Sequence, residues 1–191
     1  MKEKIKSISS STLHKIDSIF IAIICTDTLR IDDIGSTIAT FRKMFPDVMI
    51  QGINPSYIYG KRHIFEIIKI ILESNKRKIK ISKKIEIELL MRLICSNQVD
   101  KAINIGGIKN NNSGCFVLLS ETKGPIIHSI KYLRKLFVKE NRSVLNARKD
   151  KMIKICELLQ FPECDFTTKE FLYSSTFSKP DKKESPYMFV S

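Results

Sequence analysis

The chain has 191 residues, 43% hydrophobic and 28% charged, a balance that excludes a disordered, collagen-like or low-complexity protein. Its 33 lysines and arginines against 20 acidic residues give a net charge of +13. This excess indicates a polyanionic partner such as nucleic acid, an acidic protein face or an anionic membrane, and a lysine-rich genome explains it equally well. The length predicts one α/β (α+β) domain at residues 18–173, a loose N-terminal extension at 1–17 and a polar tail at 174–191.

Apolar runs and their spacing predict the elements of the N-terminal half. In chain order these are a buried strand at 19–25, a helix at 31–45, strand pieces at 48–50 and 58–59, and a helix at 60–74. Asp32 and Asp33 stand where the first helix begins, so we interpret them as a helix cap rather than a catalytic dyad. Pro46 ends that helix.

The C-terminal half begins with a basic linker at 76–84, and the next segment, 85–95, is either a strand or a helix. The alternation of Glu86 and Glu88 with isoleucines favours the strand. The later predicted elements are a helix at 97–106 with Asn97 as N-cap and Gly107 as a left-handed C′ residue, a strand at 115–119, a helix from Pro125, and a helix at 148–160. We expect Gly106 to tolerate alanine.

Residue patterns typical of catalysis are weak. The five cysteines show no C-x-x-C spacing and indicate reduced thiols in the core, and the three histidines show no metal-ligand spacing. The sequence has no Walker lysine and no G-x-S-x-G elbow. We therefore expect no catalytic residue, cofactor or metal, with a cysteine nucleophile paired with His63 as the weakest of three hypotheses.

No apolar run approaches the roughly 20 residues that span a bilayer. The N-terminus lacks the h-region and cleavage site of a signal peptide, because His14, Lys15 and Asp17 interrupt it. We expect no membrane partner and a cytoplasmic or nuclear location.

Two features of the helix at 60–74 suggest binding. The helix begins with Gly60, Lys61, Arg62 and His63, and its free backbone N–H groups and two cations there favour binding of a phosphate. The alternative interpretation is a turn glycine followed by solvated charges. Its apolar arc is also wider than a surface helix needs. Either another helix of the same chain or a partner protein covers the surplus.

Three stretches carry a family resemblance. They are Ile53-Asn54-Pro55 with residues 58–64, Glu86-Ile87-Glu88-Leu89-Leu90, and residues 96–103 ending in Gly107-Ile108-Lys109. In order and spacing, from about Ile19 to Phe137, the chain resembles the small accessory subunit of the KEOPS complex, the family of the PRPK-binding protein TPRKB.

The resemblance implies a domain with a central, mostly antiparallel sheet flanked by helices, and no catalysis. It implies binding to the small atypical kinase/ATPase of KEOPS, an indirect link to the threonylcarbamoyl transferase subunit, and binding to tRNA, including its CCA end. The complex threonylcarbamoylates the adenosine beside the tRNA anticodon. The kinase-binding residues predicted on this basis are Phe65, Ile68, Leu72, Ala102 and Ile103. The predicted tRNA-binding residues are Lys61, Arg62, His63, Lys76, Arg77 and Lys78.

The second hypothesis is a free-standing basic RNA-binding domain without a kinase partner. Affinity for the KEOPS kinase separates it from the first.

Overall fold

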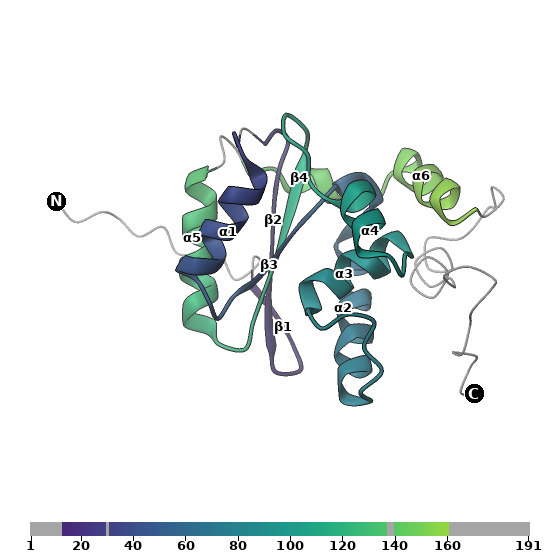
Figure 1. Cartoon of the computed structure of the whole chain (residues 1–191). Helices are drawn as coiled ribbons and strands as arrows, with labels where there is room; N and C mark the ends of the chain where they lie inside the picture. Colours follow the sequence, from purple (N-terminus) through teal and green to yellow (C-terminus); the bar gives the residue numbers. More distant parts are fainter. Residues whose placement is uncertain (1–12, 30, 137–139, 161–191) are drawn as a thin grey trace. The chain divides into compact units, whose positions relative to one another are not determined.

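The structure, a computed structural model, describes residues 13–29, 31–136 and 140–160 (Figure 1). The prediction of an α/β (α+β) fold is confirmed, with a four-stranded antiparallel sheet and six α-helices among the described residues. The chain divides into two compact units. The sheet unit joins the chain up to Gly52 with Ile108–Val144, and the helical unit joins Ile53–Gly107 with the chain from Leu145. The polar tail predicted at 174–191 lies outside the described residues.

The sheet has the strand order β1-β2-β4-β3. Strands β2 (Ile19–Thr26) and β4 (Gly114–Ser120) pair antiparallel at its centre, and β3 (Met49–Ile53) lies beside β4. Strand β1 (Leu13–Ile16) pairs antiparallel with β2. The loose extension predicted at 1–17 is therefore wrong for these four residues.

A tight turn between β1 and β2 explains why β1 pairs with β2. Asp17 has φ 51°, the left-handed conformation that two-residue hairpin turns require and that aspartate tolerates. The turn returns the chain so that Ile16 lies opposite Ile19. The polar, serine-rich start of the chain conceals this hairpin from a pattern search.

Helices α1 (Ile34–Met44) and α5 (Lys123–Leu136) lie on one face of the sheet (Figure 1). Asp33 caps α1 as predicted, since its side chain accepts a hydrogen bond from the Ser36 N–H group at 3.1 Å. The buried core of this layer consists of Ala22, Ile24, Leu29, Ile31, Phe41, Val48, Ile50, Phe116, Leu118, Ile126, Ile130 and Leu133. Alternate strand residues enter it, as expected for a sheet.

The helical unit contains η1 (Pro55–Tyr57), α2 (Gly60–Lys76), α3 (Ile85–Ile94), α4 (Val99–Gly106) and α6 (Lys149–Leu159). Helix α3 packs against both α2 and α4 (Figure 1). Helix α6 packs against η1. A second short 3-10 helix, η2 (Arg142–Leu145), precedes α6.

The strand predicted at 85–95 is wrong, because this segment is helix α3. The alternation covers only its first residues, whereas Leu89, Leu90, Leu93 and Ile94 are buried at helical spacing. The strand predicted at 58–59 is absent too; these residues form the link between η1 and α2.

Helix α4 differs from its prediction at both ends. Gln98, not Asn97, is its N-cap, and the Ser96 hydroxyl accepts a hydrogen bond from the Gln98 N–H group at 3.1 Å. Gly107 has φ −70°, so the predicted left-handed conformation is wrong. Gly107 is instead required by close approach, since a Cβ atom there would lie 2.5 Å from the Ile103 carbonyl oxygen.

Gly106 is the contact point between α4 and α3. A Cβ atom there would lie 2.5 Å from Ile94 Cγ1 and 3.0 Å from Leu90 Cδ1, so the tolerance of alanine predicted from sequence is contradicted by the packing. We expect Gly106→Ala to lower the free energy of unfolding by about 1–3 kcal/mol, the usual cost of overpacking. Chemical denaturation measures this.

Gly124 in α5 provides the matched control, because a Cβ atom there meets nothing within 4 Å. Gly124→Ala should change the free energy of unfolding by no more than about 0.5 kcal/mol, because Gly124 lies in the first turn of α5, directly before Pro125, and gains little from helix propensity. Equal effects of the two substitutions would contradict the close packing of α4 on α3.

Candidate functional site

The candidate site is built on helix α2, which begins at Gly60, where φ is +81°. Tyr59 is the N-cap and makes no side-chain cap hydrogen bond. Lys61 and Arg62 follow in the first turn and are exposed. The first turn therefore combines two cations with the positive end of the helix dipole, an arrangement that favours an anion.

His63 does not belong to this exposed group. Its side chain is buried, and its Nδ1 atom accepts a hydrogen bond from the Tyr59 N–H group at 3.2 Å. Burial lowers the pKa of His63 to about 4, so the ring is neutral at physiological pH. The buried position of His63 argues against the predicted contact with tRNA and favours a structural role at the start of α2.

Both exposed cations lie close to side chains one helical turn later. Lys61 Nζ stands 5.6 Å from the centre of the Phe65 ring, and Arg62 Nε lies 3.7 Å from Glu66 Oε1. Glu66 also pairs with Lys69 at 3.1 Å. Contacts of this kind between exposed groups contribute at most about 1 kcal/mol, so a phosphate can replace them.

A second basic group lies at the other end of α2. Lys76, Arg77 and Lys78 are exposed, as are Lys80, Lys83 and Lys84 in the segment that leads to α3. Arg77 pairs with Glu73 at 2.7 Å. The 17 residues of α2 place this group roughly 24 Å from Lys61 and Arg62, at 1.5 Å per residue. The predicted tRNA-binding residues therefore form two separate groups.

The structure also separates the predicted kinase-binding residues by burial. Ile68 and Ala102 are buried in the fold, and this burial argues against direct contact between their side chains and a partner. Phe65 and Leu72 are half-buried. Ile103 is 45% exposed. The wide apolar arc of α2 is thus largely core, the more ordinary of its two explanations.

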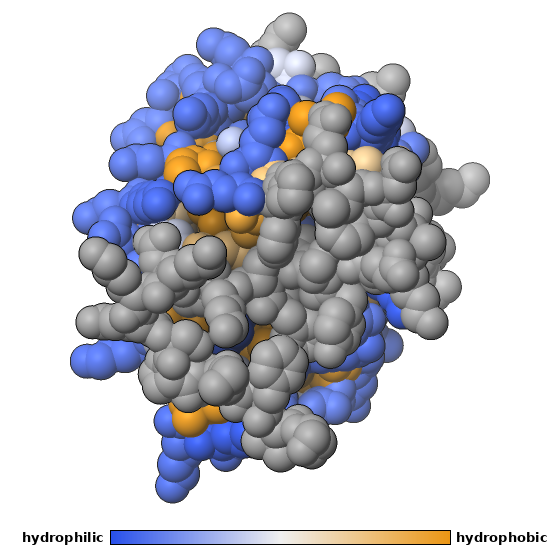
Figure 2. All heavy atoms as spheres, turned by 90° about the vertical axis from the view of Figure 1, so that its right-hand side faces the viewer, coloured by the Kyte–Doolittle hydropathy of each residue, from blue (hydrophilic) through white to orange (hydrophobic). Residues whose placement is uncertain are grey.

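Val99 is an exposed apolar residue that sequence reasoning missed. It is 40% exposed and precedes Ile103 by four residues, which places both on one face of α4. The four-residue spacing of Val99 and Ile103 is visible in the sequence, but their exposure depends on which face of α4 packs against α3. Figure 2 shows one face of the molecule, on which hydrophobic residues appear between hydrophilic ones.

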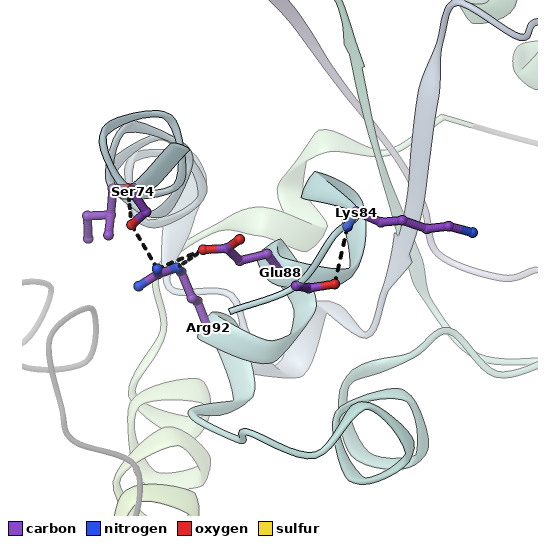
Figure 3. Close-up of polar contacts among 6 residues, drawn as sticks. Ser74, Lys84, Glu88 and Arg92 are labelled. Carbon is purple, nitrogen blue, oxygen red and sulfur yellow. Dashed lines mark hydrogen bonds and ion pairs between the residues drawn. The ribbon is translucent and has the colours of Figure 1, made fainter. Parts of the chain in front are cut away.

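A buried polar contact holds α2 and α3 together (Figure 3). Arg92 Nη2 lies 2.7 Å from Glu88 Oε1 and donates a second hydrogen bond to the Ser74 hydroxyl at 2.9 Å. The Glu88 side chain is fully buried and that of Arg92 is 17% exposed. The four-residue spacing of Glu88 and Arg92 predicts an ion pair only if the segment is helical, because residues four apart are neighbours on a helix.

The described residues include no group of three or more His, Cys, Asp or Glu side chains that could hold a metal ion. Cys25, Cys115 and Cys156 are buried and Cys95 is half-buried, while Cys164 lies outside the described part of the chain. Within the described ranges, no helix has the length and apolar character needed to cross a bilayer.

No protein-family model matches the chain, and no curated protein matches it either.

Proposed function

We propose that this protein is a non-catalytic subunit of the KEOPS complex that binds the small atypical kinase/ATPase and tRNA. In this role it supports threonylcarbamoylation of the adenosine next to the anticodon, in the cytoplasm or nucleus. The sequence resemblance motivates the proposal. The structural observation that carries it is the exposed apolar pair Val99 and Ile103, which belongs to the same helical unit as both exposed basic groups of α2.

The apolar pair supports a protein partner. Two large aliphatic side chains on one helix face are each 40% or more exposed, and such side chains serve as anchors in protein interfaces. Charged and polar neighbours border the pair, since Asn97, Gln98, Asp100, Lys101 and Asn104 are exposed. An apolar centre with a polar rim is the usual anatomy of an interface.

Affinity for the KEOPS kinase of the same genome tests this. We expect Ile103→Asp to weaken binding at least about tenfold, because it places a charge at an apolar contact. Isothermal titration calorimetry measures the dissociation constant, and circular dichroism checks the fold.

Ile81 supplies the matched control, because it is also 45% exposed but lies in the segment between α2 and α3. Ile81→Asp should leave kinase affinity unchanged. Wild-type affinity in a folded Ile103→Asp variant would place the interface elsewhere. Absence of any kinase binding by the wild type, with tRNA binding retained, would favour the free-standing RNA-binding domain.

The basic groups of α2 support the RNA part of the proposal. Replacing Lys61 and Arg62 by alanine should weaken tRNA binding and reduce its salt dependence. For single-stranded RNA, each lost phosphate contact lowers the log–log salt slope by about 0.7. Fluorescence anisotropy at several salt concentrations measures both quantities, and a tRNA without its CCA end should bind more weakly because unpaired terminal bases offer stacking and hydrogen-bonding edges.

Lys131 and Lys135 form a control pair, as both are exposed on α5 in the sheet unit. Their replacement by alanine should change affinity less. If the Lys61/Arg62 variant keeps the wild-type affinity and salt slope, this site is wrong and the 76–84 group becomes the candidate.

A further inference from the structure

Two cysteines face each other on the two central strands of the sheet, near one end of their ladder. Cys25 in β2 lies directly opposite Cys115 in β4 in the antiparallel register, and both are buried. The two strands run side by side in the sheet unit (Figure 1). Directly opposed residues of an antiparallel pair point to the same face of the sheet. The two sulfur atoms therefore share one face.

The backbone identifies the type of this pair. The Cys25 carbonyl oxygen accepts a hydrogen bond from the Asn141 N–H group at 2.8 Å, and the neighbouring residue Thr26 forms an antiparallel bridge with Glu140. The N–H and C=O groups of one strand residue point to the same edge. The N–H and C=O groups of Cys25 therefore point toward Asn141 and away from β4. Cys25 and Cys115 thus exchange no backbone hydrogen bonds and form a non-hydrogen-bonded pair.

This pair type suits a cross-strand disulfide. Non-hydrogen-bonded antiparallel pairs have Cα atoms about 4.5 Å apart, with their side chains closer than in hydrogen-bonded pairs. Disulfides join Cα atoms roughly 4.4–6.8 Å apart, so this separation lies within their range. The bond can form without moving either strand by more than a small adjustment.

We propose that Cys25 and Cys115 are an oxidation-sensitive dithiol that closes to a disulfide under hydrogen peroxide. One thiolate attacks a peroxide oxygen and becomes a sulfenic acid, releasing hydroxide. The second thiol attacks this sulfur, the S–S bond forms, and water leaves. In total, two thiols lose two electrons and two protons, and one peroxide becomes two water molecules. The proposal is independent of the proposed function.

The pair is buried, so a small oxidant reaches it only when the nearby end of the β2–β4 ladder opens. Thr26 and Gly114 form the last pair of the β2–β4 ladder, one residue beyond the cysteines. Ends of ladders open more readily than their centres. Hydrogen peroxide is small and uncharged, so a brief opening at this end is sufficient.

Mass spectrometry of the full-length native protein tests the proposal. The reduced protein is treated with a tenfold excess of hydrogen peroxide for 24 hours, alkylated and digested with trypsin. The two cysteines fall on peptides 16–30 and 110–123, each of which contains one cysteine. We expect a linked peptide of their combined mass less two hydrogens, which dithiothreitol separates.

Cys156→Ser is the matched control, because Cys156 is also buried but belongs to the helical unit. This variant should form the same linked peptide, whereas Cys115→Ser should not. The oxidised wild type should melt at least about 4 °C higher than the reduced protein, because the bond closes a loop of about 90 residues in the unfolded chain. Peptides 16–30 and 110–123 recovered unlinked from native wild-type protein, or linked mainly to other cysteines, would overturn the proposal.

Discussion

Arg92→Met should lower the free energy of unfolding by about 3–5 kcal/mol. The substitution keeps most of the aliphatic volume but leaves Glu88 as a buried carboxylate without its cation, and an uncompensated buried charge has a cost of this size. The Glu88 Oε2 atom has no hydrogen-bond partner among the described residues, so Oε1 carries the whole ion pair. Denaturant unfolding followed by circular dichroism measures the change.

The exposed pair Glu73–Arg77 is a matched control. It has the same residue types, the same four-residue spacing and the same 2.7 Å separation as Glu88–Arg92, but its arginine side chain is 61% exposed. Arg77→Met should cost less than about 1 kcal/mol. The double variant Glu88→Leu/Arg92→Met should be more stable than Arg92→Met alone, because no charge remains buried. Equal losses for Arg92→Met and Arg77→Met would contradict the role assigned to burial.

Acidification should destabilise the protein through His63. In the folded chain burial lowers its pKa to about 4, whereas the unfolded chain has the ordinary value of about 6.5. Below pH 6.5 the unfolded state therefore binds a proton that the folded state excludes, and stability falls with pH. The loss attributable to His63 is about 2 kcal/mol by pH 5 and about 3 kcal/mol by pH 4.

His63→Asn isolates this contribution, because asparagine retains a hydrogen-bond acceptor for the Tyr59 N–H group but does not titrate in this range. The free energy of unfolding, measured from pH 7.5 to pH 5, should fall by about 2 kcal/mol more in the wild type than in the variant. Parallel curves for the two proteins would show that His63 does not remain neutral in the fold.

The sequence by itself determined those elements in which the apolar residues follow either the strand period of about two or the helix period of about 3.6, but not both. The run at 19–25 is rich in β-branched residues and forms β2. The helical spacing within 31–45, with Asp33 as the cap, forms α1. In these segments local preference and burial act in the same direction. The basic groups at the two ends of α2 could also be identified, because exposed charge needs no tertiary partner.

Only the tertiary structure decided the secondary structure and burial of segments whose local residue pattern conflicts with their long-range contacts. The alternating glutamates of α3 suggest a strand, but the segment is a buried helix. Its packing against α2 and α4 and the ion pair between Glu88 and Arg92 stabilise the helical state. The burial of His63, Ile68 and Ala102 likewise depends on neighbours that periodicity cannot specify. Hydrophobic burial depends on which surfaces meet in the folded chain, so a pattern shows that a helix has an apolar face without showing what covers it.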